Sequence, residues 1–369
     1  MLTFIHISDL HIGKKLYCYD LLDDQKYVLD KILSYIDEYK PDAVFISGDI
    51  YDRTNPSEEA IALLSEFLER LQASNSEVFV IAGNHDPGEK LSFLSSVVDK
   101  SGLHIMGKFK GKLEKRSIAG ADIYMLPYIR TVDAKHYFPD SSIESLKDAM
   151  NIIFDSSPID KSKINILLAH QAVIGAITSG SEDITIGGES PIPSSIFSDF
   201  DYVALGHIHR AQAVGKSNIR YSGSILKYSA SEREPKVAVY GRISDEGAVD
   251  IEELKLEPLH DVVIKKGTFN EIMSGKNTDD YVYVVLTDET DIPDAVSALM
   301  GRFPRFLAME YQNTRTKNLS KSIVIGNTER ERKPDEFFSE LFEMMMKKKM
   351  SKEQESIIDC EIKRIWGKS

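Results

Sequence analysis

The 369-residue sequence has only two cysteines, Cys18 and Cys360, which lie near opposite ends of the chain. Two such distant cysteines exclude the disulfide framework of small secreted proteins, and reduced thiols are usual inside cells. Long apolar runs are also missing, because no stretch approaches the ~18–20 apolar residues that span a bilayer. The first segment, MLTFIHISDLH, has neither the basic region nor the cleavage site of a secretory signal. We therefore expect a cytoplasmic protein that does not insert into a membrane.

An excess of positive charge is also lacking, since the formal net charge is −13. Non-specific binding to nucleic acid depends on Lys and Arg that neutralise phosphates, so this balance alone argues against a nucleic-acid partner. Divalent cations can reverse the argument locally, because the charge of a bound ion dominates its site. The basic stretch Lys108–Arg116 could add to such a site, although a run of charges more often forms a solvated surface turn.

Short apolar segments alternate with amphipathic helices in the first part of the chain, which is typical of an α/β fold with a largely parallel sheet. The expected strands are FIHIS, AVFISG, VFVIAG, INILLAH and YVALGH. One helix is expected around Leu29–Ile36; for the next, Asn55 is the predicted cap, with Pro56 at the first position and Glu58 closing a capping box. From Ile219, the segments IRYSGSI, KVAVYGRIS and VDIEELKL predict a second, more antiparallel sheet packed against the first.

The length predicts two or three structural units. We place a catalytic core at 1–258, a small α+β capping domain at 259–318, a polar linker at 319–333 and a helix pair at 334–369. Ser351 and Gln354 are expected to form a capping box at the start of the last helix. Both final helices carry an apolar stripe, which either packs back on this chain or binds a partner.

Residue types that bind metal ions follow each of the five strands expected in the first part of the chain. They are Asp9 and His11, then Asp49, then Asn84 and His85, then His170, then His207 and His209. The carboxyl ends of the strands in an α/β sheet line one crevice, so these side chains are expected to converge. Singly, each is more often structural, but together they indicate a metal site. The remaining histidines, at 6, 104, 136 and 260, are interpreted as structural.

The mixture of carboxylate, amide and imidazole groups suits two adjacent divalent ions that one carboxylate bridges. Such a pair activates a water and orients a phosphate for in-line displacement. Mixed nitrogen and oxygen ligands favour Mn²⁺, Fe²⁺ or Zn²⁺ over Mg²⁺, which prefers oxygen. The residues therefore predict hydrolysis of phosphodiesters with two metal ions.

The motifs DLH, GDIYDR, GNHD, AHQ and GHIHR resemble those of the calcineurin-like metallophosphoesterase superfamily. This resemblance implies an α/β fold in which two sheets form an αββα sandwich. The segments HISDLHIGKKL, GHIHRAQ and YSGSILKYSASE, and the order of core, capping domain and helix pair, are similar to the SbcD-type nuclease family. Members of that family are the nuclease subunits of bacterial SbcC–SbcD DNA-repair complexes.

The resemblance also implies a role for each site residue. Asp9, His11, Asp49 and His209 would hold the first ion, and Asp49 would bridge to a second ion held by Asn84, His170 and His207. The expected cofactor is two Mn²⁺ ions per chain, and His85 would face the scissile phosphate as the catalytic general acid. Arg53, Arg210 and Asp52 are possible substrate contacts; archaeal and eukaryotic counterparts have histidine at the position of Asp52.

The same resemblance implies that the protein would be a Mn²⁺-dependent DNA nuclease, an exonuclease on duplex ends and an endonuclease on single-stranded or hairpin DNA. It would act as a homodimer, with its C-terminal helix pair on the coiled coil of an SbcC-type ATPase. Two other functions remain open. One is a small-molecule phosphoesterase, because the same metal core serves many substrates. The other is a non-catalytic scaffold, although a scaffold has no need to retain the complete set of ligands.

Overall fold

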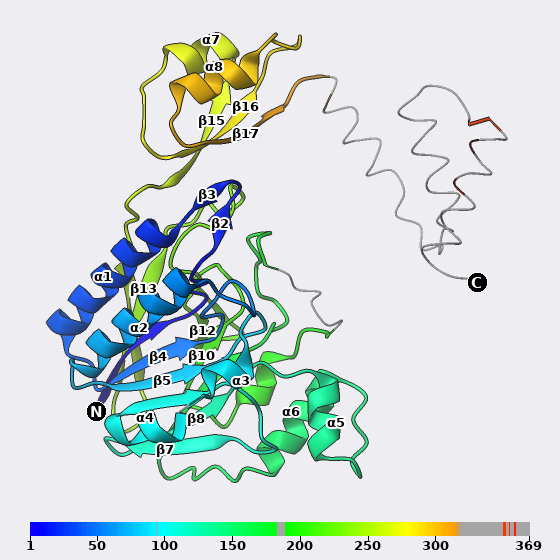
Figure 1. Ribbon diagram of the computed structural model, residues 1–369. Coiled ribbons are helices and arrows are strands. Elements are labelled where there is room, and N and C mark those ends of the chain that lie inside the picture. Colours follow the sequence, from blue (N-terminus) through cyan, green and yellow to red (C-terminus); the bar gives the residue numbers. More distant parts are fainter. Residues whose placement is uncertain are drawn as a thin grey trace. The chain divides into compact units, whose positions relative to one another are not determined.

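The computed structural model describes residues 1–93, 95–182, 189–314 and 316, together with positions 350, 351, 354 and 358. The chain divides into two compact units, Met1–Tyr311 and Gln312–Ser369. The first unit contains two six-stranded sheets, a three-stranded sheet and a two-stranded ribbon (Figure 1). In its described part, no helix is long and apolar enough to cross a bilayer.

In the first six-stranded sheet, four neighbouring strands run parallel, and a pair of strands that are antiparallel to each other extends the sheet on one side. In spatial order its strands are β14 (Val249–Lys255), β13 (Val237–Ile243), β1 (Leu2–Ile7), β4 (Ala43–Ser47), β5 (Glu77–Ile81) and β6 (Leu103–Met106). Strands β1, β4, β5 and β6 run parallel, whereas β13 pairs antiparallel with both β1 and β14.

The second six-stranded sheet has four parallel strands flanked by an antiparallel strand at each edge. Its spatial order is β11 (Gln212–Val214), β12 (Lys216–Tyr221), β10 (Tyr202–Gly206), β9 (Ile164–His170), β8 (Ala121–Leu126) and β7 (Glu114–Ile118). Strands β12, β10, β9 and β8 run parallel, and β11 and β7 pair antiparallel with their neighbours.

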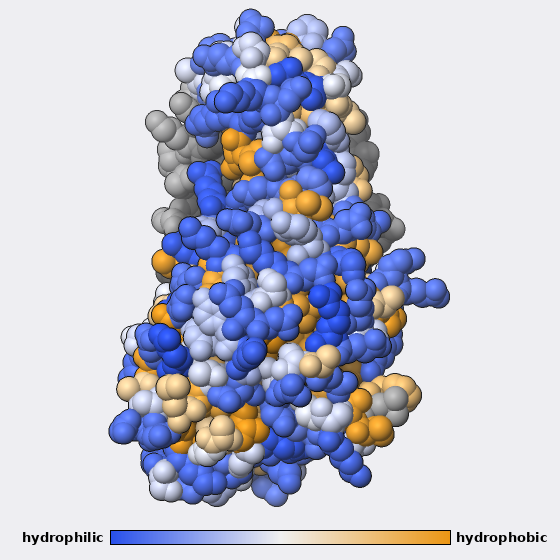
Figure 2. All heavy atoms as spheres, turned by 90° about the vertical axis from the view of Figure 1, so that its left-hand side faces the viewer, coloured by the Kyte–Doolittle hydropathy of each residue, from blue (hydrophilic) through white to orange (hydrophobic). Residues whose placement is uncertain are grey.

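The helices of the first unit lie on the outer faces of the two six-stranded sheets and beside the three-stranded sheet. They are α1 (Leu22–Tyr39), α2 (Glu58–Gln72), α3 (Gly88–Leu91), α4 (Ser95–Val98), α5 (Thr131–Tyr137), α6 (Leu146–Asp155), α7 (Phe269–Ser274) and α8 (Ala295–Arg302). Two 3₁₀ helices, η1 (Asp99–Ser101) and η2 (Ser194–Phe197), complete the set. The face that carries α1 and α2 is mainly hydrophilic, with scattered apolar residues (Figure 2).

Alternation along the strands explains why the two sheets stack. In β1, Phe4 belongs to the hydrophobic cluster between the sheets, whereas Ile5 belongs to the cluster under α1 and α2. Phe45 and Phe79 follow the same pattern in β4 and β5. Successive side chains of a strand point to opposite faces of its sheet. Helices cover one face and the second sheet covers the other, so both sets of side chains are apolar. The predicted αββα sandwich is confirmed.

The allocation of strands to the sheets differs from the prediction. The strands INILLAH and YVALGH, expected beside FIHIS, form β9 and β10 of the second sheet, and KVAVYGRIS and VDIEELKL join the first sheet as β13 and β14. The periodicity of a strand reports which of its faces are buried, but not which strand it pairs with. Backbone pairing between distant segments, such as Ile5 with Tyr240, decides the sheet.

The cap of α2 also differs from the prediction. Ser57 is the N-cap, and its hydroxyl accepts a hydrogen bond from the backbone N–H of Ala60 at 3.3 Å. The side chain of Asn55 instead accepts a hydrogen bond from Nζ of Lys90 at 2.7 Å. Because Ser57 has the extended backbone of a cap, the helix begins at Glu58 rather than at Pro56.

The three-stranded sheet alternates strands with helices in the order β15, α7, β16, α8, β17. Its strands β15 (Val262–Gly267), β16 (Tyr281–Leu286) and β17 (Phe306–Tyr311) are all parallel. Tyr281 also belongs to the hydrophobic cluster of α1, and its hydroxyl donates to Oδ2 of Asp24 at 2.9 Å. The ribbon of β2 (Lys15–Leu16) and β3 (Tyr19–Asp20) precedes α1. The domain boundary expected between 258 and 259 stays a prediction.

The linker at 319–333 lies outside the described residues, as do most residues of the helix pair at 334–369. The capping-box hydrogen bonds predicted between Ser351 and Gln354 are confirmed. The backbone N–H of Ser351 donates to Oε1 of Gln354 at 2.9 Å, and the N–H of Gln354 donates to the Ser351 hydroxyl at 3.3 Å. Each side chain thus accepts from the backbone N–H of the other residue, as in a capping box.

Candidate metal centre

All eight residues predicted at strand ends lie at the carboxyl ends of five parallel strands, three from the first sheet and two from the second. Asp9 and His11 follow β1, Asp49 follows β4, Asn84 and His85 follow β5, His170 ends β9, and His207 and His209 follow β10. Strand β4 contacts both β9 and β10 across the sandwich. The site therefore draws on both sheets, which the single-sheet prediction did not anticipate.

Four of these residues have the left-handed backbone conformation that residues other than glycine rarely adopt. The φ angles are 52° at Asp9, 43° at His11, 49° at Asp49 and 100° at His207. Each such residue costs on the order of 1–3 kcal/mol and persists only where its surroundings hold it. Here the backbone N–H of Asp9 donates to Gly48 O at 3.0 Å, and that of His11 donates to Asp49 O at 2.9 Å. Strain at these positions indicates that the directions of the side chains matter.

Two glycines allow the strand ends to approach closely. A β-carbon at Gly48, whose φ is +89°, would lie 2.3 Å from Nδ1 of His170. A β-carbon at Gly206 would lie 1.9 Å from the carbonyl oxygen of Ser47. These distances are far below van der Waals contact, so neither position has room for a side chain. Glycine at these two turns lets β4 approach β9 and β10.

A first group of donor atoms surrounds His11. The ligand atoms of Asp9, His11 and His209 lie within 4.8 Å of one another. Nε2 of His11 is 3.1 Å from Nε2 of His209 and 3.6 Å from Oδ2 of Asp49. All four side chains are buried, with at most 3% of each residue exposed.

A second group surrounds the amide oxygen of Asn84. Nε2 of His170 lies 3.1 Å from Oδ1 of Asn84, and Nδ1 of His207 lies 3.0 Å from the same oxygen. Nε2 of His170 is also 3.4 Å from Oδ2 of Asp49, so Asp49 faces both groups. The structure thus brings the seven predicted ligands together, and their division between two ions stays a prediction.

Burial and neighbouring charges set the protonation of the site. Burial raises the pKa of Asp9, and it lowers the pKa of His207 to about 3 and that of His11 well below its ordinary value. Burial also tends to lower the pKa of His170. The attraction of Asp49 and Asp9 for the protonated ring is larger in sum, and the pKa of His170 rises to about 9. Burial by itself would raise the pKa of Asp49, but the neighbouring His170 holds that pKa well below its usual range.

This arrangement fits divalent cations. The lowered pKa values of His11 and His207 leave both imidazoles neutral at pH 7 with lone pairs to offer, and Asp49, whose pKa is held low, adds a buried carboxylate 3.6 Å from His11. Within the described part of the chain, Nδ2 of Asn84 has no hydrogen-bond partner, so the amide is held only through its oxygen. Carboxylate, amide and imidazole donors in this number suit two ions with mixed oxygen and nitrogen shells.

His85 lies beside these donor groups with its imidazole half-buried. Its Nδ1 is 3.0 Å from the carbonyl oxygen of Asp52. A carbonyl oxygen can only accept, so Nδ1 carries the hydrogen and Nε2 remains for another partner. The donor atoms of His85, His11 and Asp52 also lie within 4.8 Å of one another. The predicted catalytic role of His85 is compatible with this orientation.

The three possible substrate contacts lie at the edge of the site. Asp52 accepts a hydrogen bond from Nζ of Lys14 at 2.6 Å and lies 3.7 Å from Nδ1 of His11. Arg53 is exposed and pairs with Asp52 at 3.4 Å, whereas Arg210 pairs with Glu234 at 3.0 Å. Asp52 and Arg53 line a cavity of about 450 Å³ together with Lys15. Contact between these residues and a substrate stays a prediction.

The other four histidines lie away from the donor groups. His6 contacts the Tyr202 hydroxyl, His104 lies between Asp99 and Glu77, and His260 contacts Asp24. His136 is exposed on α5.

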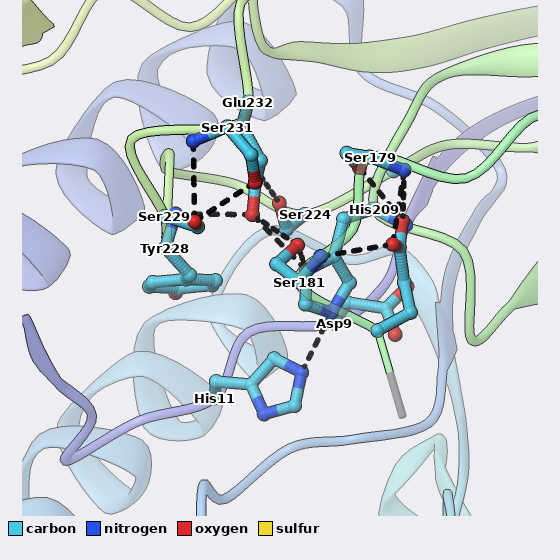
Figure 3. Close-up of polar contacts among 12 residues, drawn as sticks. Asp9, His11, Ser179, Ser181, His209, Ser224, Tyr228, Ser229, Ser231 and Glu232 are labelled. Atoms are coloured by element: carbon cyan, nitrogen blue, oxygen red, sulfur yellow. Dashed lines mark hydrogen bonds and ion pairs between the residues drawn. The ribbon is translucent and has the colours of Figure 1, made fainter. Parts of the chain in front are cut away.

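Several polar residues that support the site were not singled out in the sequence. Asp86, the last residue of the GNHD motif, accepts backbone hydrogen bonds from Gly83, Ile50 and Tyr51 at 2.8, 3.1 and 2.9 Å. It thereby ties the turn after β5 to the turn after β4. Glu232 and Ser181 contact Nδ1 of His209 at 3.2 and 2.9 Å (Figure 3). Glu232 lies within YSGSILKYSASE, but its distance from the ligands in sequence concealed its role.

Comparison with known families identifies the group to which the site belongs. Residues 2–211 match the family model described as calcineurin-like phosphoesterase. The chain belongs to the calcineurin-like phosphoesterase family. The match covers more than half of the chain and all eight strand-end residues, so this family member is a metal-dependent phosphoester hydrolase with a candidate dimetal site.

Solved structures similar to this family member share little sequence with it. A dimetal phosphatase from Danio rerio has 12% identity and a TM-score of 0.42, covering 70% of this chain and 98% of its own. The protein TT1561 of Thermus thermophilus has 9% identity and a TM-score of 0.40, covering 68% and 98%. GAP50 of Plasmodium, described as the anchor in the inner membrane complex, has 12% identity and a TM-score of 0.38, covering 69% and 89%. At these values the similarity does not extend to substrate.

Proposed function

We propose that this phosphoesterase is a Mn²⁺-dependent DNA nuclease that acts with an SbcC-type ATPase in the processing and repair of DNA ends. The observation that carries the chemistry is the convergence of seven metal-binding side chains from five strand ends, with His85 beside them. The choice of DNA as substrate rests on the segments HISDLHIGKKL, GHIHRAQ and YSGSILKYSASE, which are similar to the SbcD-type family. The small three-stranded parallel sheet after residue 258 supports the same choice, since it adds a further unit to the catalytic core.

In the proposed reaction, Asp9, His11 and His209 would hold one ion and Asn84, His170 and His207 the other, and Asp49 would serve both. Two divalent cations supply Lewis acidity and an activated water for in-line displacement at phosphorus. The chain contributes the fixed directions of the ligands, which the strained turns and the backbone hydrogen bonds maintain. Mn²⁺ is the proposed ion because the donor set mixes imidazole nitrogen with carboxylate and amide oxygen.

His85 is the proposed general acid. Its backbone N–H donates to Oδ1 of Asp49 at 2.9 Å, which fixes the main chain of His85 to the carboxylate shared by the two ions. Its Nδ1–H donates to Asp52 O, so Nε2 is the nitrogen that would face the leaving oxygen of the phosphodiester. Asp52 thus positions His85 through its carbonyl group, while its carboxylate stays near His11 and Lys14.

Cleavage assays with Mn²⁺ test this proposal directly. We expect degradation of blunt duplex ends and nicking of single-stranded and hairpin DNA, and we expect the cognate ATPase to change the rates. The main alternative is a small-molecule phosphoesterase, which the net charge of −13 would suit because it does not attract a polyanion. Hydrolysis of small phosphoesters with all three DNA substrates left intact would contradict the nuclease proposal.

The quaternary structure is part of the same proposal. A homodimer through helices of the core, and docking of the helix pair at 334–369 on the partner's coiled coil, follow from the resemblance to the SbcD-type family. Light scattering coupled to gel filtration measures the first. The expected result is a particle mass of twice the chain mass of 41.5 kDa.

A further inference from the structure

A buried polar network lies behind His209, on the side of its ring away from the other ligands. Nδ1 of His209 is 2.9 Å from the hydroxyl of Ser181 and 3.2 Å from Oε1 of Glu232 (Figure 3). The opposite nitrogen, Nε2, faces Nε2 of His11 at 3.1 Å. His209 therefore lies between the metal-binding donors and a carboxylate that is itself not among them.

The directions of these hydrogen bonds follow from the chemistry of the groups. The Ser181 hydroxyl donates its single hydrogen to Oε1 of Glu232 at 2.6 Å. Its oxygen can then only accept from His209, and a carboxylate oxygen can only accept as well. Both neighbours of Nδ1 are acceptors, so Nδ1 carries the hydrogen. Nε2 is left with its lone pair directed at the donor group of Asp9 and His11.

Glu232 is held firmly in this place. Only 2% of the residue is exposed, and it pairs with the buried ammonium group of Lys236. The backbone N–H of Tyr228 donates to its Oε1 at 3.2 Å. Ser181 and Tyr228 donate to Oε1 of Glu232 and Lys236 pairs with its Oε2, so Glu232 accepts at both carboxyl oxygens.

Lys236 connects the same ion pair to the main chain of the ligand. Its Nζ donates to the carbonyl oxygen of His209 at 2.9 Å and to the Ser224 hydroxyl at 2.8 Å. The ring and the backbone of His209 are thus both held by one buried ion pair. Buried ion pairs contribute little to stability compared with apolar residues of the same size, which argues for a role in placement.

We propose that Glu232, acting through Ser181 and directly, is a positioning residue that fixes the Nδ1–H tautomer of His209 and strengthens Nε2 as a ligand for the first metal ion. A carboxylate behind a ligating histidine raises the basicity of the nitrogen that binds the ion. Loss of such a partner lowers metal affinity by about 10–100-fold. The inference rests on the proposed metal site, but the tautomer exists without a metal and can be measured without activity.

The test variant is Glu232→Met with Lys236→Met, which removes the carboxylate without leaving a buried ammonium group unpaired. The matched control is Glu234→Met, two residues away, where the glutamate pairs with Arg210 and is about one third exposed. A third variant, Glu232→Gln, keeps an oxygen that accepts from Ser181, so it should retain the tautomer. Circular dichroism checks folding; if the double variant does not fold, Glu232→Leu with Lys236→Leu replaces it.

Two readouts are needed. Nitrogen-15 NMR of the metal-free protein reports the tautomer of His209, and calorimetry with Mn²⁺ reports the affinity of each ion. We expect the double variant to lose the uniform Nδ1–H form and to bind the first ion about 10–100-fold more weakly, with a much smaller change for the second. Glu234→Met should match the wild type in both readouts.

An unchanged tautomer in the double variant, or an equal loss of both ions, would overturn the proposal. The proposed function fails separately, if the wild-type protein binds two Mn²⁺ ions but leaves DNA intact. If the wild type binds no Mn²⁺, the metal site fails as well, and the role of Glu232 as a ligand-positioning residue fails with it.

Discussion

Gly83 lies directly against Asp49, the carboxylate that faces both groups of candidate metal-binding donors. A β-carbon at position 83 would be 2.1 Å from Oδ1 of Asp49 and 2.3 Å from its backbone nitrogen. The φ angle of Gly83 does not lie in the left-handed region, so close approach is the reason for glycine here. The turn after β5 can therefore pack on the turn after β4 only without a side chain at this position.

Gly83→Ala should displace Asp49 and weaken the binding of both ions, because Asp49 is shared between the two donor groups. We expect a loss of about tenfold or more in Mn²⁺ affinity, on the scale seen when the support of a ligand is removed. Gly301→Ala is the control, since a β-carbon there meets nothing within 4 Å in helix α8. Calorimetric titration with Mn²⁺ measures both variants. Wild-type affinity in Gly83→Ala would show that the turn can relax.

His85→Ala should lower the turnover of the phosphodiester by about 10²–10⁴-fold, the contribution of a general acid. The seven proposed ligands remain, so the content of two Mn²⁺ ions should not change. Elemental analysis and cleavage kinetics on the same preparation separate the two effects. Exposed His136 provides the control variant, His136→Ala. If His85→Ala loses metal together with activity, His85 is a ligand and not an acid.

Replacing His6 should change how stability depends on pH. Burial, reinforced by Arg220, lowers the pKa of His6 from 6.5 to about 3, so this histidine stays neutral in the folded protein while it is protonated in the unfolded chain. Between these two values the unfolded state binds more protons, and stability falls as the pH falls, by up to about 1.4 kcal/mol per pH unit.

The variant His6→Asn keeps a polar group near Tyr202 but does not titrate in this window. Urea unfolding at several pH values between about 4 and about 6.5 should give a shallower slope than the wild type, by up to one proton. His136→Asn should keep the wild-type slope because His136 is exposed. Equal slopes in His6→Asn and the wild type would contradict the neutral, buried state of His6.

Tyr281→Phe should destabilise the contact between the small sheet and α1. The Tyr281 hydroxyl donates to Oδ2 of Asp24, and both residues are 3% exposed. Its removal leaves a buried carboxylate oxygen without this donor, which costs about 1–3 kcal/mol. Tyr283→Phe is the control on the same strand, because the Tyr283 hydroxyl donates to an exposed Glu310. This substitution should change stability by less than about 0.5 kcal/mol. Denaturant unfolding compares the two variants, and equal losses would argue against the contact with Asp24.

Truncation after Arg332 tests the proposed role of the C-terminal helices. We expect the shortened protein to lose binding to an SbcC-type ATPase while its Mn²⁺-dependent cleavage of DNA stays largely unchanged, because every proposed ligand precedes residue 210. Co-purification measures binding, and a nuclease assay without the ATPase measures activity. A complex that still forms would place the docking surface elsewhere in the chain.

The sequence alone determined the local features of this protein. Apolar strands followed by polar residues at Asp9, Asp49, Asn84, His170 and His207 predicted where ligands emerge, because strand ends and turn residues are encoded within a few neighbouring positions. The same local rules predicted the capping box of Ser351 and Gln354. Motif order then led to the sandwich and to the family that comparison confirmed.

Only the tertiary structure decided the relations between distant segments. It placed β9 and β10 in the second sheet, brought Ser47 within 2.8 Å of Nδ1 of His170, and put Glu232 behind His209. Strand pairing and the support of ligands depend on contacts between residues far apart in sequence, and periodicity carries no information about partners. A hydrogen bond such as that from Ser181 to Glu232 is therefore invisible until the chain has folded.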